Sequence, residues 1–202
     1  MIIKAYNNQL RSNDLTLIAK TLQKGGVIIY PTDSVYAFAC LPEQQNAIER
    51  ICRLRNIPTK QPKLTLMCQN IAQAREYTLF SDDIFKLIRA HCPGPYTFIL
   101  QGNSHLPKTF KGRKTVGIRI PDHPVTAAIL NEIQSPLMTA SLRTPIDNDI
   151  EYMTDPELME EMYHDIDIII DAGIGNTTPT TIIDCTEEDP IILRQGEGQI
   201  DL

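Results

Sequence analysis

Small hydroxylated and basic residues stand where apolar segments of this sequence end. Thr32 and Ser34 follow the run VIIY, Thr139 and Ser141 lie at the end of another apolar run, and Arg119 lies inside VGIRIP. Ligands of open α/β sheets gather beyond the carboxyl ends of strands, so these residues would suit a carboxylate, a phosphate or a polar amino acid. The same residue types populate turns and caps irrespective of function, which leaves both interpretations open.

The familiar catalytic motifs are missing from the sequence. It contains no GxSxG elbow, no GxxxxGK[ST] loop, no HExxH and no GxGxxG after a strand. The five cysteines and four histidines are scattered, without a CxxC pair or a local cluster. We therefore expect reduced, mostly buried thiols and no metal held by side chains alone.

Charge is divided unevenly along the chain. Six basic residues and no acidic one lie from Arg50 to Arg75, and five basic residues and no acidic one lie from Lys108 to Arg119. The segment from Thr144 to Leu193 holds fourteen acidic residues and no Lys or Arg. Either this is solvated surface that happens to segregate, or a basic concave face binds phosphate or nucleic acid while the acidic segment lies elsewhere.

Periodicity and capping residues predict the elements that would position these side chains. The predicted helices are Leu15–Lys24, Glu43–Arg55, a helix capped by Ser81 that runs to His91, Pro124–Glu132 and Pro156–Tyr163. The predicted strands are Val27–Tyr30, Leu64–Cys68, Thr97–Leu100, Thr115–Ile120, Leu137–Ala140, Asp167–Asp171, Thr181–Asp184 and Ile191–Leu193. This order predicts a large mixed sheet with helices packed on it. The segment Arg143–Asp155 is the most loop-like and is a candidate for a mobile flap.

Length and composition predict a single domain over residues 1–202. A chain of 202 residues with 42% hydrophobic content can bury one sizeable core. No apolar run approaches the roughly 20 residues of a membrane span, and the N-terminal segment lacks the apolar run of a signal peptide. We therefore expect a cytoplasmic protein without membrane contact. The residues by themselves indicate an α/β domain with a basic cleft that binds an anion.

The segment GGVIIYPTDSVYAFAC, residues 25–40, resembles the opening signature of the YrdC-like family, a glycine pair and an apolar strand followed by PT[DE]T-x-Y-G-L. Further motifs follow in the family's order: PGPYTFIL at 93–100, TVGIRIPDHP at 115–124, PLMTASL at 136–142, PTTIID at 179–184 and ILRQGEG at 192–198. The resemblance covers about residues 10–200 and is greatest to the stand-alone YciO branch. It implies a single-domain, twisted, open mixed β-sheet with packed helices and a basic concave surface.

The resemblance also implies an activity. Members of the family make L-threonylcarbamoyladenylate from L-threonine, bicarbonate and ATP, with Mg²⁺ carried by the nucleotide, and the product feeds the threonylcarbamoyl modification of adenosine 37 in tRNA. Such a nucleotidyltransferase needs positioning and charge neutralisation rather than a covalent catalyst, so the missing motifs are no objection. Two alternatives stay open: a module that binds double-stranded RNA or tRNA through the basic face, and an enzyme that forms another carbamoyl or acyl adenylate.

The family motifs assign expected roles to individual residues. Those that would bind the amino acid are Thr32, Tyr36, Arg119 and Thr181, with Arg119 on its carboxylate. Those that would bind the nucleotide are Arg55, Thr115, Ser141, Arg143 and Arg194. Arg55, Ser141 and Arg143 are also the candidates for catalysis by positioning.

Two family motifs are altered where the ATP phosphates would be held. The K-x-R pair reads Arg55-Asn56-Ile57, and the S-x-N pair reads Ser141-Leu142-Arg143. Losing a charge-assisted hydrogen bond to a phosphate typically removes roughly two powers of ten in rate or affinity. We therefore expect a slow or accessory synthase unless Arg55 and Arg143 compensate with their own guanidinium groups.

Overall fold

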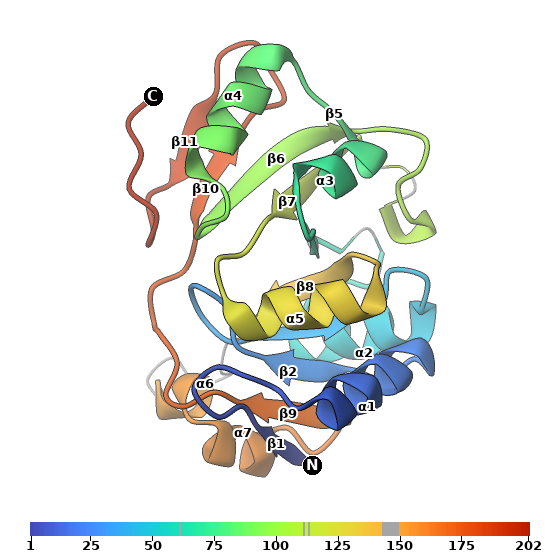
Figure 1. Ribbon diagram of the computed structural model, residues 1–202. Helices are drawn as coiled ribbons and strands as arrows, with labels where there is room; N and C mark the ends of the chain where they lie inside the picture. The colour runs from blue at the N-terminus through green and yellow to red at the C-terminus, as the bar shows by residue number, and fades with distance from the viewer. Residues whose placement is uncertain (61, 111, 113, 143–149) are drawn as a thin grey trace.

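One mixed β-sheet organises the chain (Figure 1), as seen in a computed structural model that describes all residues except 61, 111, 113 and 143–149. Within the described residues its strand order is β1-β9-β2-β3-β8-β4-β7-β6-β10-β11, with β5 paired to β6. The strands are β1 (Ile2–Lys4), β2 (Ile28–Tyr30), β3 (Ala37–Cys40), β4 (Thr65–Met67), β5 (Thr78–Leu79), β6 (Tyr96–Gly102), β7 (Thr115–Arg119), β8 (Leu137–Ser141), β9 (Ile168–Asp171), β10 (Thr181–Asp184) and β11 (Ile191–Arg194).

Parallel and antiparallel pairs alternate irregularly across the sheet. The pairs β1–β9, β2–β9, β4–β7 and β6–β10 are parallel. The pairs β2–β3, β3–β8, β4–β8, β6–β7 and β10–β11 are antiparallel. The mixed α/β fold predicted from the sequence is confirmed.

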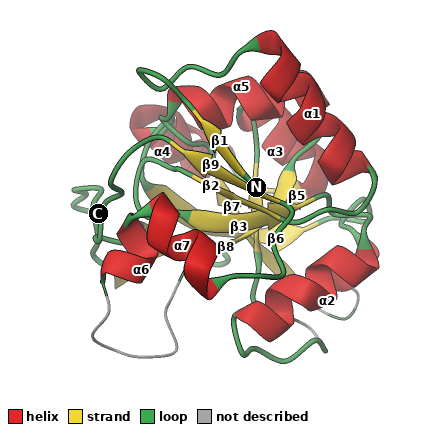
Figure 2. Ribbon diagram, turned by 90° about the horizontal axis from the view of Figure 1, so that it is seen from below, coloured by secondary structure: helices red, strands yellow, loops and turns green. Residues whose placement is uncertain are grey.

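Helices cover the sheet on both faces. They are α1 (Ser12–Gln23), α2 (Gln45–Leu54), α3 (Ile71–Tyr77), α4 (Asp82–His91), α5 (Pro124–Ile133), α6 (Glu151–Thr154) and α7 (Pro156–Met162), with a 3-10 turn at Lys108–Phe110. Figure 2 shows α1 and α5 on one side of the strands and α2 on the other. No helix in the described part of the chain is both long and apolar enough to cross a bilayer.

Strand β2 shows how the sequence builds two cores. Successive side chains of a strand point to opposite faces, so Ile28 and Tyr30 share a face and Ile29 lies on the other. Ile28 and Tyr30 join the buried cluster under α1 and α5, whereas Ile29 joins the larger cluster under α2. The strand therefore reads as a continuous apolar run, because both of its faces are buried.

Most predicted elements are confirmed, with boundaries shifted by a few residues. Ser81 caps α4 by accepting a hydrogen bond from the backbone N–H of Ile84 at 3.3 Å, and Pro124 is the first residue of α5. Strands β1, β3 and β5 and helix α3 were not predicted. The loop predicted at Arg143–Asp155 is wrong for Glu151–Thr154, which form α6. The rest of that candidate flap, residues 143–149, lies outside the described residues.

Candidate active site

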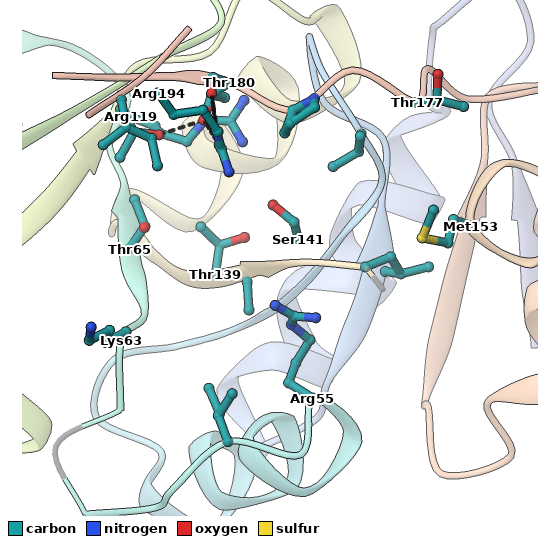
Figure 3. A pocket seen from close by; sticks show the side chains of 17 residues that line it. Arg55, Lys63, Thr65, Arg119, Thr139, Ser141, Met153, Thr177, Thr180 and Arg194 are labelled. Carbon is teal, nitrogen blue, oxygen red and sulfur yellow. Dashed lines mark hydrogen bonds between the residues drawn. The ribbon is translucent and has the colours of Figure 1, made fainter. Parts of the chain in front are cut away.

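A cavity of about 330 Å³ opens on one face of the sheet. Helix α5 covers another part of the same face. The cavity is lined by hydroxylated, basic and apolar side chains (Figure 3). Its cations are Arg55, Lys63, Arg119 and Arg194, and no acidic residue is found among the described lining residues. The cavity is therefore electropositive and of a size suited to a small ligand.

The alternation of strands β4 and β8 explains why hydroxyl groups face this cavity. Thr65 pairs with Thr139, and Met67 pairs with Leu137. Residues two apart on a strand share a face, so Thr65 lies on the same side of the sheet as Met67, and Thr139 on the same side as Leu137. Met67 and Leu137 are buried in the cluster under α5, whereas both threonines line the cavity.

Arg119, at the end of β7, is the most buried cation of the cavity. Its side chain is 5% exposed and forms an ion pair with Asp33, whose side chain is 6% exposed. The same terminal nitrogen donates to the hydroxyl of Ser34 at 3.1 Å and lies 3.5 Å from that of Thr32. Its Nε is buried and has no hydrogen-bond partner among the described residues. One terminal nitrogen of this guanidinium thus makes the contacts with the turn after β2, whereas Nε has no partner among the described residues.

The turn after β2 holds Asp33 in place. The Thr32 hydroxyl donates to the carbonyl of Val35 at 2.7 Å and accepts from the N–H of Ser34 at 3.1 Å. The second carboxylate oxygen of Asp33 accepts from the N–H of Asp122 at 2.8 Å. Thr32 therefore shapes the turn, and it lines a smaller neighbouring cavity of about 180 Å³ rather than the cationic one.

Tyr36 lies in the wall of this smaller cavity. Its hydroxyl donates to the carbonyl of Gly173 at 2.8 Å and accepts from the N–H of Ala172 at 3.1 Å. Burial raises the pKa of Tyr36 to about 12, so the hydroxyl stays protonated as a donor. A Cβ on Gly175 would lie 2.5 Å from the Tyr36 ring, which explains why a glycine stands there. Tyr36 ties the loop after β9 to the turn after β2.

A β-bulge in β11 turns Arg194 toward the cationic cavity. Ile192 pairs with Ile183, but Arg194 pairs with Ile182, so Leu193 is the extra residue. On a regular strand, residues two apart share a face. Here Ile192 packs on the core, whereas Arg194 lines the cavity together with Ile182, because the bulge lies between Ile192 and Arg194. Arg194 donates through Nε and one terminal nitrogen to the carbonyl of Thr180, at 2.9 and 2.7 Å.

The structure places the remaining predicted residues unevenly. Arg55, at the C-terminal end of α2, and Ser141, at the end of β8, both line the cationic cavity. Thr115 begins β7, four residues before Arg119 and thus about 13 Å away along the strand, and it is not among the lining residues. Arg143 lies outside the described residues. The binding roles of all of them stay predictions.

Among the predicted site residues, Thr181 is the one whose hydroxyl group is most fully used in hydrogen bonds within the protein. Its side chain is fully buried, and its hydroxyl donates to the carbonyl of Gly198 while accepting from the N–H of Gly196 at 2.8 Å. The neighbouring Thr180 faces the cavity instead and shares a hydroxyl hydrogen bond of 2.8 Å with Thr97. Thr181 thus fixes the C-terminal turn that follows Arg194.

Sequence reasoning missed several lining residues, namely Lys63, Thr65, Thr97 and Thr180, and it missed Asp33 as the partner of Arg119. Lys63 lies in the acid-free segment from Arg50 to Arg75, so the charge pattern contained a signal. The threonines carried none, because threonine is common in strands irrespective of function.

A cationic, hydroxyl-lined cavity at the strand ends of an open mixed sheet is the kind of place where α/β proteins hold small ligands. The chain belongs to the Sua5/YciO/YrdC family, whose model, described as "Telomere recombination", matches residues 20–196.

Two relatives align over most of the chain. YciO of Escherichia coli K12, an uncharacterized protein, is 38% identical over 182 residues, which cover 89% of this chain and 87% of YciO. The threonylcarbamoyl-AMP synthase of Vibrio vulnificus YJ016 is 29% identical over 189 residues, which cover 91% of this chain and 99% of the synthase. The resemblance inferred from the motifs is confirmed.

Solved structures share the fold. The crystal structure of E. coli YciO superposes with a TM-score of 0.88 at 35% identity, covering 98% of this chain and 96% of YciO. The crystal structure of P. abyssi Sua5 complexed with L-threonine superposes with a TM-score of 0.82 at 22% identity, covering 97% of this chain and 57% of Sua5. The second similarity is one of fold alone.

Proposed function

We propose that this protein is a nucleotidyltransferase of the L-threonylcarbamoyladenylate synthase type, which joins L-threonine, bicarbonate and ATP and releases pyrophosphate. One observation carries the proposal: Arg119, whose buried Nε–H has no hydrogen-bond partner among the described residues, lines a cavity with three further cations and, among its described lining residues, no acid. An unpaired buried donor is costly, and a ligand that accepts a hydrogen bond from it removes that cost. The near full-length similarity to a threonylcarbamoyl-AMP synthase supports the same reaction.

The amino acid would bind at Arg119. A carboxylate accepts a charge-assisted hydrogen bond from a guanidinium better than a neutral acceptor does. Since Asp33 already offsets the charge of Arg119, this end of the cavity suits a ligand with a single negative group more than a polyphosphate.

The nucleotide would bind toward Arg55, Ser141 and Arg194, which line the rest of the cavity. The threonine amine adds to carbon dioxide derived from bicarbonate and loses a proton, giving a carbamate. A carbamate oxygen then forms a bond to the α-phosphorus of ATP, and the bond to the bridging oxygen breaks with its electron pair leaving on pyrophosphate. The protein's part is to align the two anions and to neutralise charge that develops on the phosphates.

A protein-held Mg²⁺ does not fit this cavity. Mg²⁺ prefers carboxylate oxygens and water, and the described lining residues include no Asp or Glu. Mg²⁺ would therefore enter with the ATP phosphates, and the side chains of this chain contribute no ligand to it in the proposal.

The test is pyrophosphate release from ATP, Mg²⁺ and bicarbonate, with L-threonine, with L-valine and with no amino acid. We expect release that depends on L-threonine, and a product with the mass of the carbamoyl adenylate. Valine is the matched control, because it has the shape of threonine without the hydroxyl. Release that is independent of threonine and of bicarbonate, or no release, would overturn the proposal.

RNA binding is the alternative that a negative result would favour. A duplex would need an extended basic surface rather than a cavity of about 330 Å³. Its signature would be an RNA affinity that falls steeply with salt and does not respond to threonine.

A further inference from the structure

The four cations of the cavity differ in what already holds them. Arg119 is paired with Asp33, and Arg194 donates to the carbonyl and the hydroxyl of Thr180. Lys63 forms no ion pair with any residue that the structure describes, and its side chain is exposed at the cavity. A ligand can therefore engage its ammonium group without displacing a protein carboxylate, which is not so for Arg119.

The backbone fixes Lys63 on the cavity face. Leu64 and Leu66 are buried in the core under α2, whereas Thr65 lies in the cavity. Because side chains alternate along an extended segment, Lys63 shares the face of Thr65. Figure 3 shows Lys63 beside the strand that carries Thr65, with Arg55 reaching up from the end of α2 toward Thr139 and Ser141.

Ile57 lines the same cavity and stands at the position where the K-x-R pattern has its second basic residue. Ile57 and Lys63 belong to the same connection between α2 and β4. The cation missing at Ile57 is thus matched by another cation from the same segment, six residues later. This wall of the cavity therefore carries a positive charge at Lys63, although Ile57 supplies none.

We propose that Lys63 binds the polyphosphate of the nucleotide and takes over the charge that Ile57 does not supply. This inference rests on the proposed function, because it assumes that the cavity takes ATP. A compact ammonium with three donors suits the several phosphate oxygens of a triphosphate, which need no bidentate geometry. It follows that Lys63 contributes to specificity for ATP over AMP.

The test compares the Lys63→Gln and Lys63→Arg variants with a control, Lys60→Gln. Lys60 is exposed in the same connection but does not line the cavity. Dissociation constants for ATP and for AMP are measured by calorimetry without threonine, and circular dichroism checks the fold. Charge-assisted hydrogen bonds are stronger than neutral ones. We therefore expect Lys63→Gln to raise the dissociation constant for ATP about tenfold or more, and that for AMP less than about twofold. Lys63→Arg and Lys60→Gln should stay within about threefold of the unaltered protein for both nucleotides.

Three results would overturn the inference. If Lys63→Gln binds ATP like the unaltered protein, Lys63 does not hold the phosphates, and the proposed function is untouched. If Lys63→Gln weakens the binding of ATP and AMP equally, or if Lys63→Arg loses as much ATP affinity as Lys63→Gln, the residue does not act through its positive charge on the polyphosphate. If the unaltered protein binds no ATP, both this inference and the proposed function fail.

Discussion

Arg119 and Asp33, 86 residues apart in the chain, form an ion pair in which both side chains are almost fully buried. Asp33 also accepts from the N–H of Asp122, two residues before α5 begins. The pair therefore connects the turn after β2 with the segment between β7 and α5. It fixes the orientation of the guanidinium group of Arg119, a residue that lines the cavity.

Removing either partner of this pair should destabilise the fold strongly. Breaking a buried ion pair leaves an uncompensated charge, which typically costs about 3–5 kcal/mol. We expect Arg119→Ala and Asp33→Ala each to lower the free energy of unfolding by an amount in that range, measured by urea denaturation. The double variant should lose less than the sum of the two, with a coupling of about 1–3 kcal/mol. Additive losses would show that the two charges do not depend on each other.

Tyr36→Phe should destabilise the protein although the ring is retained. The substitution leaves the carbonyl of Gly173 and the N–H of Ala172 without the hydroxyl that now bonds both. Leaving fully buried polar groups unsatisfied costs about 1–3 kcal/mol, and these two groups are only part-buried, so we expect a loss of about 1 kcal/mol and faster amide exchange at Ala172. Tyr6→Phe is the control, because Tyr6 is 69% exposed. Equal stability of the two variants would contradict the role given to Tyr36.

Gly117→Val should impair ligand binding more than folding. A Cβ at this position would lie 3.1 Å from the Thr65 hydroxyl oxygen and 3.3 Å from the Thr97 methyl carbon, and both threonines line the cavity. Valine suits a strand, so the added side chain should fill the cavity floor while β7 is retained. We expect ATP affinity to fall in the order Gly, Ala, Val, with unchanged far-ultraviolet circular dichroism. A folded valine variant with unaltered affinity would place the ligand elsewhere.

Local pattern was enough to predict the fold class but not every element. The apolar run before Tyr30 and the capped helix at Ser81 carry their signals within a few residues, and both predictions are confirmed. Strand β1 has three residues, which are too few to show the alternation of apolar and polar residues that is typical of a strand. Strand β3, AFAC, is also buried on both faces, but two of its four residues are alanine, which is depleted in strands, so its apolar run is a weaker strand signal than VIIY.

The site was predicted in its residue types more than in its geometry. Hydroxyl groups at the end of β8 were expected to face a ligand, and Thr139 and Ser141 do line the cavity. The contact of Arg119 with Asp33 depends on strands brought together by tertiary packing, which no spacing in the chain encodes. The β-bulge that turns Arg194 toward the cavity could not be predicted from the sequence either, because it arises from the pairing of β10 with β11.

His123 should make the stability of the protein depend on pH. Its ring borders the smaller cavity, its Nδ1 is buried without a partner among the described residues, and burial lowers its pKa from 6.5, against the opposing effect of Asp33 and Asp122. Between the lowered folded pKa and about 6.5, the unfolded state binds more protons, so stability rises with pH in this window. The stabilisation is complete above about pH 6.5 and is lost as the pH falls toward the folded value.

The matching measurement is the free energy of unfolding of the unaltered protein minus that of His123→Gln, from pH 8 down to pH 5. Both proteins carry the same other titrating groups, so their contributions cancel in the difference. We expect the difference to be constant above about pH 7 and to fall below it, because only the unaltered protein must keep the imidazole neutral on folding. A difference that rises as the pH falls would mean that Asp33 and Asp122 outweigh burial, and that the ring is held as a cation beside the Arg119 pair.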